Sequence, residues 1–227
     1  MKTISIPALA TLLLAGLVCL PSCGGGDWPP PVKPDLATAP PAVAQPAGPP
    51  AAFFGSGSRA DHLCYVVDRS GSMIDTFDAV RTEMLVSIAR LRSSQDFHII
   101  LFAEGNPKEL MHRRLVPATD RYKEDVATFL ETIRAEGKTD PIPALLRAFD
   151  VLAQADPSKP GKVIYLLTDG VFPDNQAVLK AIRARNADKG VIIHTFLYGN
   201  KPPEAEKVMK DIAAENGGKY KFVSTEE

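Results

Sequence analysis

Three short stretches combine carboxylates with hydroxyls, the oxygen donors that Mg²⁺, Mn²⁺ and Ca²⁺ accept. Asp68-Arg69-Ser70-Gly71-Ser72 places one carboxylate and two hydroxyls within five residues. Leu167-Thr168-Asp169-Gly170 supplies a second carboxylate, and the loop Gly137-Lys138-Thr139-Asp140 supplies a third hydroxyl. If the fold brings these stretches together, they form one cation site. Its candidate ligands are Asp68, Ser70, Ser72, Thr139 and Asp169.

The first stretch also has a simpler explanation. Asp and Ser are favoured at turns and helix N-caps, because their oxygens accept the first free backbone N–H groups. For the pentapeptide alone, this explanation is as good as a metal site. The surrounding elements have to decide between the two.

Those elements alternate between strands and helices. Continuous apolar runs are typical of strands that are covered on both faces, as in a parallel sheet. Four such runs occur, and a short fifth strand is expected at the end: Leu63–Val67, Phe97–Phe102, Val163–Leu167, Val191–Tyr198 and Tyr220–Val223. The segment Leu110–Val116 has His and Arg in its middle, and the connection before it is too short for a crossover helix. We expect it to be an antiparallel edge strand.

Helical spacing of apolar residues fills the gaps between the strands. Helices are expected from about Phe77, from about Tyr122 to Ile133, after Asp140-Pro141, over 175–188 and over 204–216. The sequence therefore predicts a doubly wound α/β domain over residues 61–227. Its six-stranded sheet is mostly parallel, with one antiparallel edge strand and helices on both faces. In such folds, ligands bind at the carboxyl ends of the strands where the strand order reverses.

The pattern Asp68-x-Ser70-x-Ser72, then Thr139 in a Gly-x-Thr-Asp loop, then Thr168-Asp169-Gly170 resembles the von Willebrand factor type A domain with its metal-ion-dependent adhesion site. The resemblance covers essentially all of residues 61–227, and the order of the elements agrees. One departure is Lys138, which stands where many members have a second glycine.

The resemblance implies a role for each site residue. The Ser70 and Ser72 hydroxyls bind the ion directly, and Thr139 binds it directly or through water. Asp68 and Asp169 act mainly through waters and by holding the hydroxyls. The expected ion is Mg²⁺, with Mn²⁺ or Ca²⁺ as alternatives, and its open position favours an acidic side chain of a protein partner.

Enzymatic alternatives have weaker support. Aspartyl-phosphate chemistry at Asp68 needs a second carboxylate two residues on, where this chain has Ser70. A serine nucleophile needs a partnering base, and the four histidines fall on predicted strands. The sequence has no Gly-x-Ser-x-Gly or Gly-x-Gly-x-x-Gly motif. With a net charge of −1 and no basic block, it also does not favour nucleic acid as a partner. We therefore expect no enzyme activity.

The N-terminal region differs from the predicted domain. Residues 1–22 have a positive start and an apolar run from Ala8 to Leu20, as in a signal peptide. Leu20-Pro21-Ser22-Cys23 resembles the lipobox of bacterial lipoproteins, with Cys23 as the lipidated residue and Pro21 as an unusual member. A plain secretory signal is the alternative. Residues 23–60 are rich in Pro and Ala and are expected to form an extended linker.

Together these features predict a metal-dependent protein-binding module on a lipid anchor in the bacterial cell envelope. The anchor would lie in the outer membrane or face the periplasm, because Gly24 gives no acidic retention signal after Cys23. The alternative is a scaffold subunit of an envelope complex, in which the metal only orders the loops.

Overall fold

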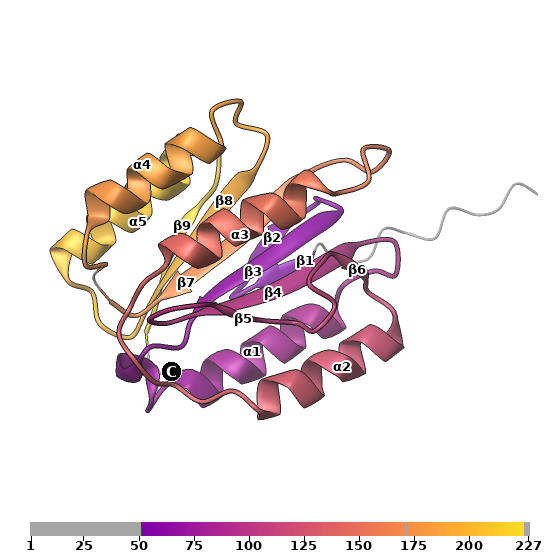
Figure 1. The fold of residues 1–227 in the computed structure, drawn as a ribbon, viewed down its shortest axis with the longest axis horizontal. Coiled ribbons are helices and arrows are strands. Elements are labelled where there is room, and N and C mark those ends of the chain that lie inside the picture. The colour runs from indigo at the N-terminus through magenta and orange to yellow at the C-terminus, as the bar shows by residue number, and fades with distance from the viewer. Residues whose placement is uncertain (1–50, 171, 225–227) are drawn as a thin grey trace, which may run out of the picture. The chain divides into compact units, whose positions relative to one another are not determined.

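The computed structural model describes residues 51–170 and 172–224 of the chain. Their central sheet has the strand order β5-β4-β3-β7-β8-β9, and β6 also pairs with β4 (Figure 1). The strands are β3 (His62–Asp68), β4 (Asp96–Phe102), β5 (Lys108–Glu109), β6 (Val116–Pro117), β7 (Lys162–Thr168), β8 (Ile192–Tyr198) and β9 (Tyr220–Val223). Strands β4, β3, β7, β8 and β9 run parallel to one another. The predicted doubly wound, mostly parallel sheet is confirmed.

Helices cover both faces of this sheet (Figure 1). They are α1 (Phe77–Ala89), α2 (Asp120–Glu131), α3 (Ile142–Ala153), α4 (Asn175–Arg185) and α5 (Pro203–Glu215). Alternate residues of β3 point to opposite faces. Tyr65 and Val67 belong to the core cluster under α1 and α2. Cys64 and Val66 belong to the cluster under α3, α4 and α5. Because its strands are buried on both faces, the sheet reads as continuous apolar runs in the sequence.

The edge of the sheet differs from the prediction. A single strand over Leu110–Val116 was expected, but β5 and β6 are two dipeptides on either side of that segment, both antiparallel to β4. The segment between them turns instead of extending. Its Arg113 has a φ of 52°, and the Arg113 N–H donates to the Leu110 carbonyl at 2.9 Å. This left-handed residue breaks the strand, so the sheet has seven strands in the described part of the chain.

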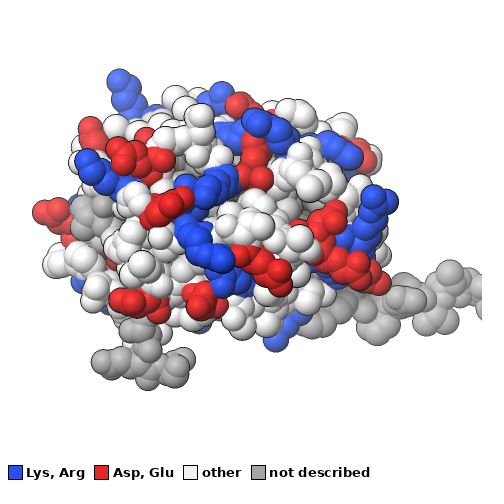
Figure 2. All heavy atoms as spheres, turned by 60° about the horizontal axis from the view of Figure 1, so that its bottom comes forward, with Lys and Arg blue, Asp and Glu red and all other residues white. Residues whose placement is uncertain are grey.

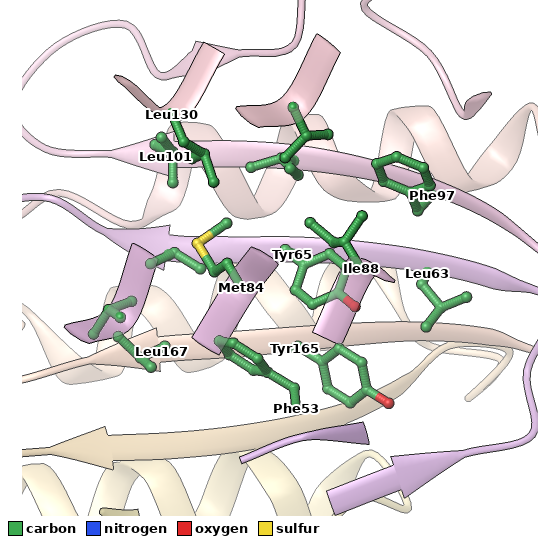
Figure 3. Close-up of a cluster of buried hydrophobic side chains, with 14 of the residues drawn as sticks. Phe53, Leu63, Tyr65, Met84, Ile88, Phe97, Leu101, Leu130, Tyr165 and Leu167 are labelled. Atoms are coloured by element: carbon green, nitrogen blue, oxygen red, sulfur yellow. The ribbon is translucent and has the colours of Figure 1, made fainter. Parts of the chain in front are cut away.

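The predicted linker also ends earlier than residue 60. Residues 51–58 form a hairpin of β1 (Ala51–Phe53) and β2 (Ser56–Ser58). Phe53 is fully buried and lies against Tyr65, Tyr165 and Phe196 with ring centroids 5.1–5.8 Å apart (Figure 3). The aromatic ring gives the hairpin a large apolar surface to bury against the sheet. The hairpin therefore packs on the same face of the sheet as α1 and α2.

The strand order sets the place of the site. From β3 the chain crosses to β4 on one side, and it later returns to β7 on the other side of β3. The order of the sheet therefore reverses between β3 and β7, where the carboxyl ends Asp68 and Thr168 lie. None of the helices in the described part of the chain is long and apolar enough to cross a membrane. The predicted signal peptide, Cys23 and residues 23–50 lie outside the described residues.

Candidate metal centre

Asp68 is the last residue of β3, and its side chain is fully buried. The Ser70 N–H donates to Asp68 Oδ1 at 2.8 Å, so the carboxylate holds the turn that follows the strand. The Thr168 hydroxyl donates to Asp68 Oδ2 at 2.6 Å from the end of the neighbouring strand. Asp68 is therefore fixed by a contact from each side of the switch point.

The two serine hydroxyls continue from this carboxylate toward the second one. Ser70 Oγ and Ser72 Oγ lie 3.1 Å apart, and the Ser72 hydroxyl donates to Asp169 Oδ1 at 3.0 Å. Ser70 is buried, whereas Ser72 is exposed to solvent. The structure thus brings four of the five predicted ligands together as a connected set of oxygens that leads from the interior to the surface.

The electrostatics of this set favour a cation. Burial raises the pKa of the Asp68 carboxyl to about 6, although the hydrogen bonds from Thr168 and Ser70 lower it, and the charge of Asp169 raises it further. Burial also raises the pKa of Asp169. Within the described ranges, neither carboxylate forms an ion pair with Lys, Arg or His. Two clustered carboxylates with no cation of their own, together with two hydroxyls, fit a hard divalent ion.

The third predicted loop lies next to the first. The Gly71 N–H donates to the Gly137 carbonyl at 2.8 Å, and Gly137 has a φ of 77° that favours glycine. Two residues further along, Thr139 is half-buried. It lines a cavity of about 350 Å³ between the start of α3 and the segment before α4. In the described part of the chain, the Thr139 hydroxyl makes no hydrogen bond to the other four predicted ligands. The loop is therefore in place, although its hydroxyl does not belong to the connected set.

Sequence reasoning missed two residues that shape this centre. No role was assigned to Thr168, although its position at the end of an apolar strand, beside Asp169, was visible. Arg69 was treated as a spacer, yet its side chain is only 6% exposed and contacts the loop before Gly137. The sequence carries no signal for this burial, because arginines are mostly exposed.

Groups of three or more His, Cys, Asp or Glu side chains suited to a metal do not occur among the residues that the structure describes. The four histidines have other partners. Nε2 of His62 lies 3.0 Å from the Asp156 carbonyl, and Nε2 of His98 and of His112 lie beside carboxylates. The Lys219 N–H donates to His194 Nδ1. A metal at the carboxyl edge of the sheet thus depends on the hydroxyl-rich set around Ser70 and Ser72.

Comparison with known proteins agrees with the fold. Residues 63–171 match the sequence profile of the von Willebrand factor type A domain. The human von Willebrand factor A domain-containing protein 3A is 29% identical over 162 residues, which cover 70% of this chain and 13% of that protein. The chain therefore corresponds to a small part of that much longer relative.

Solved structures resemble the chain as well. A von Willebrand factor type A protein from Catenulispora acidiphila superimposes with a TM-score of 0.63 at 20% identity, covering 74% of this chain and 40% of that one. The manganese-loaded TRAP protein of Plasmodium vivax superimposes with a TM-score of 0.56 at 19% identity, covering 73% and 68%. These identities establish the fold alone. The described chain has the fold of von Willebrand factor type A domains, and residues 63–171 carry the match to that family.

Proposed function

We propose that this chain is a divalent-metal-dependent protein-binding module, displayed on a lipid anchor outside the cytoplasm. The observation that carries the proposal is the connected set Asp68–Ser70–Ser72–Asp169 at the switch point between β3 and β7. The manganese found in the structurally similar TRAP protein supports the choice of a divalent ion.

The residues present suit Mg²⁺ or Mn²⁺, with Ca²⁺ as an alternative. Ser70 and Ser72 would hold the ion, Thr139 would approach from the third loop, and Asp68 and Asp169 would act as outer partners. When bound, the ion would supply an electron-poor position that attracts an anionic oxygen. The expected partner is therefore a protein that offers an Asp or Glu side chain.

Recognition of this kind is local. The face drawn in Figure 2 shows Lys and Arg side chains mixed with Asp and Glu side chains, without a broad field of one sign. A partner that approaches this face would meet little net attraction at long range. We expect the exposed position next to Ser72 to contribute most of the specificity.

We propose binding and not catalysis as the work of this site. A serine nucleophile needs a base within hydrogen-bond distance. Within the described residues, the hydroxyl of Ser70 contacts Ser72, and the hydroxyl of Ser72 contacts Ser70 and Asp169, with no histidine partner for either. The four histidines are held by other groups. The arrangement therefore offers ligands for an ion, and neither serine has a histidine base beside it among the described residues.

The anchor is proposed from the sequence of the N-terminal region. The lipobox-like Leu20–Cys23 and the proline-rich linker would hold the domain at a distance from a membrane. With about 3.1 Å per residue in a proline-rich chain, a linker over 24–50 reaches on the order of 80 Å. A domain on such a tether can reach partners across an envelope compartment.

A scaffold role with a structural metal is the second candidate. The buried Asp68 carboxylate, which has no ion pair in the described part of the chain, favours it, because a cation that neutralised this charge would stabilise the loops without any partner. The two candidates differ in what happens when the ion is removed. A scaffold would lose stability, whereas a binding module would lose a partner while staying folded.

A pull-down from envelope extract tests the proposal. The full chain is presented with Mg²⁺ or with chelator, beside the Ser70→Ala/Ser72→Ala variant, and the melting temperature is measured in each condition. A partner that is captured only by the wild type with Mg²⁺, from a domain that stays folded in chelator, supports the binding module. Equal capture in chelator contradicts it, and unfolding in chelator favours the scaffold.

A further inference from the structure

Arg69 lies between the first two predicted ligands, and it is the least exposed of the ion-paired arginines in the described chain. Its side chain is 6% exposed. Its Nη1 donates to the Arg134 carbonyl at 3.3 Å and to Glu136 Oε1 at 3.1 Å. Both acceptors belong to the segment between α2 and α3. The arginine therefore reaches across from the loop of Asp68 to the loop that leads to Thr139.

Backbone hydrogen bonds connect the same two loops. The Glu136 N–H donates to the Arg69 carbonyl at 2.8 Å, and the Gly71 N–H donates to the Gly137 carbonyl at 2.8 Å. The Arg69 N–H donates to the Phe102 carbonyl at the end of β4, also at 2.8 Å. Residue 69 thus joins the ends of two strands to the third loop, three residues before Thr139.

Burial of the Arg69 guanidinium costs solvation free energy. Its Nε has no hydrogen-bond partner in the described structure, and its charge partner Glu136 is 59% exposed. An apolar side chain of similar volume often packs as well as a buried ion pair. What the apolar side chain lacks is the charged Nη1 donor that holds both the Arg134 carbonyl and the Glu136 carboxylate.

We propose that Arg69 is a positioning residue of the metal centre. Its guanidinium holds the segment 134–137 against the Asp68–Ser72 loop, and so places the Thr139 hydroxyl where it reaches an ion held by the serines. The inference rests on the proposed metal site. It adds that the third loop is held in place by a side chain that is not one of the predicted ligands.

The contact of Arg69 with Glu136 can be changed separately from its contact with the Arg134 carbonyl. Glu136 Oε1 also accepts from Lys108 Nζ at 3.1 Å, so the same carboxylate contacts both Arg69 and Lys108 of β5. In Glu136→Gln the side-chain oxygen can still accept from Arg69 Nη1, and the contact of Arg69 with the Arg134 carbonyl stays. Glu136→Gln is expected to weaken the hold less than loss of the arginine does.

The test is a Mn²⁺ titration of the full chain, followed by the thermal shift of the domain. Arg69→Met keeps the bulk of the side chain and removes the donor to the Arg134 carbonyl and to Glu136, which keeps its hydrogen bond from Lys108. The midpoint of the Mn²⁺ titration is expected to rise about tenfold or more, as for other groups that orient metal ligands. The matched control is Arg81→Met. Arg81 Nη2 donates to the Ile133 carbonyl of the same segment at 3.2 Å but does not touch the metal loop. Its midpoint is expected to stay within twofold of the wild type.

A double-mutant cycle with Thr139→Ala separates positioning from general stability. If Arg69 acts through Thr139, the double variant has the same Mn²⁺ midpoint as the single variant that binds Mn²⁺ more weakly. If the two residues act independently, the fold-changes of the midpoint multiply. Arg69→Lys keeps the charge but not the planar guanidinium that sets the direction of Nη1. It covers the case in which the methionine variant does not fold, and its midpoint is also expected to rise.

Three results overturn the inference. The first is that folded Arg69 variants bind Mn²⁺ like the wild type. The second is that Arg81→Met shifts the midpoint equally, and the third is that the effects of Arg69 and Thr139 multiply. A wild type without any Mn²⁺ response overturns the metal site itself, and so is distinguished from a failure of Arg69 alone.

Discussion

The Thr168 hydroxyl donates a 2.6 Å hydrogen bond to Asp68 Oδ2, and both groups are fully buried. The two residues end neighbouring strands, 100 positions apart in the chain. The contact joins the ends of β3 and β7 in the interior, and Asp68 Oδ1 stays free to accept the Ser70 N–H. The geometry of the serine loop therefore depends on Thr168, which is not one of the predicted metal ligands.

Thr168→Val removes this donor and preserves the shape of the side chain. We expect a loss of about 1–3 kcal/mol in the free energy of unfolding, since Asp68 is left short of a partner in the interior. We also expect a higher Mn²⁺ midpoint, because the carboxylate is no longer fixed. Chemical denaturation and thermal shift measure the two effects.

Thr195→Val is the matched control for this prediction. The Thr195 hydroxyl is also buried and donates to the Met209 carbonyl at 2.8 Å, on the far side of β7 from Asp68. It should lose similar stability with an unchanged Mn²⁺ midpoint. If Thr168→Val also left the midpoint unchanged, the positioning role of Thr168 would be wrong.

Local pattern predicted most of this fold, because the strands are buried on both faces. The runs around Val66, Ile100 and Leu166 are typical of strands in a covered sheet, and the structure has them within a residue or two of the expected bounds. The pattern failed where one residue reverses the chain. Arg113 adopts a positive φ, which cannot be predicted from an arginine in the sequence, so a continuous edge strand was expected there.

The site could be predicted in part for a similar reason. Asp68 ends a strand, and Ser70, Ser72 and Asp169 lie within four residues after one, so the strand order fixes where they meet. Thr139 lies on a loop whose course depends on tertiary contacts, such as that between Gly71 and Gly137. Arg69 and Thr168 support the site by burial, which residue type alone does not reveal.

The N-terminal hairpin is expected to be part of the folded domain. Phe53→Ala removes a fully buried ring from the aromatic cluster with Tyr65, Tyr165 and Phe196. We expect a loss of about 3–5 kcal/mol in the free energy of unfolding, from lost burial and the cavity left behind. Met111→Ala, at a side chain that is 79% exposed, should change it by less than about 0.5 kcal/mol. If denaturant titrations gave equally small changes in the free energy of unfolding for Phe53→Ala and Met111→Ala, the hairpin would not contribute to the core.

Acid should destabilise the domain through His194. Burial lowers the pKa of His194 below its ordinary value of 6.5, and the nearby charge of Lys219 lowers it further. The folded state keeps the imidazole neutral, whereas the unfolded chain protonates it near pH 6.5. This contribution to stability is therefore fully present above pH 6.5 and is lost as the pH falls from 6.5 through the lower folded-state pKa.

His194→Asn keeps an oxygen to accept the Lys219 N–H, which donates to Nδ1 at 3.0 Å in the wild type. The variant should lose less stability than the wild type between pH 7.5 and pH 5, as measured by denaturant unfolding in chelator. His98, whose pKa is also lowered by burial, and Asp68 and Asp169, whose pKa values are raised by burial and which act with the opposite sign, leave a residual dependence in both proteins. An unchanged pH dependence in the variant would mean that His194 is not the titrating group.

The position of the ion itself is the most direct test of a metal centre at the switch point. A crystal of the domain grown with Mn²⁺, measured at the manganese absorption edge, should give one strong anomalous peak within coordination distance of the Ser70 and Ser72 hydroxyls, on the side of Asp169. The same experiment on Ser70→Ala/Ser72→Ala should give none there. A peak at another place on the domain, or an equal peak in the variant, would contradict the account.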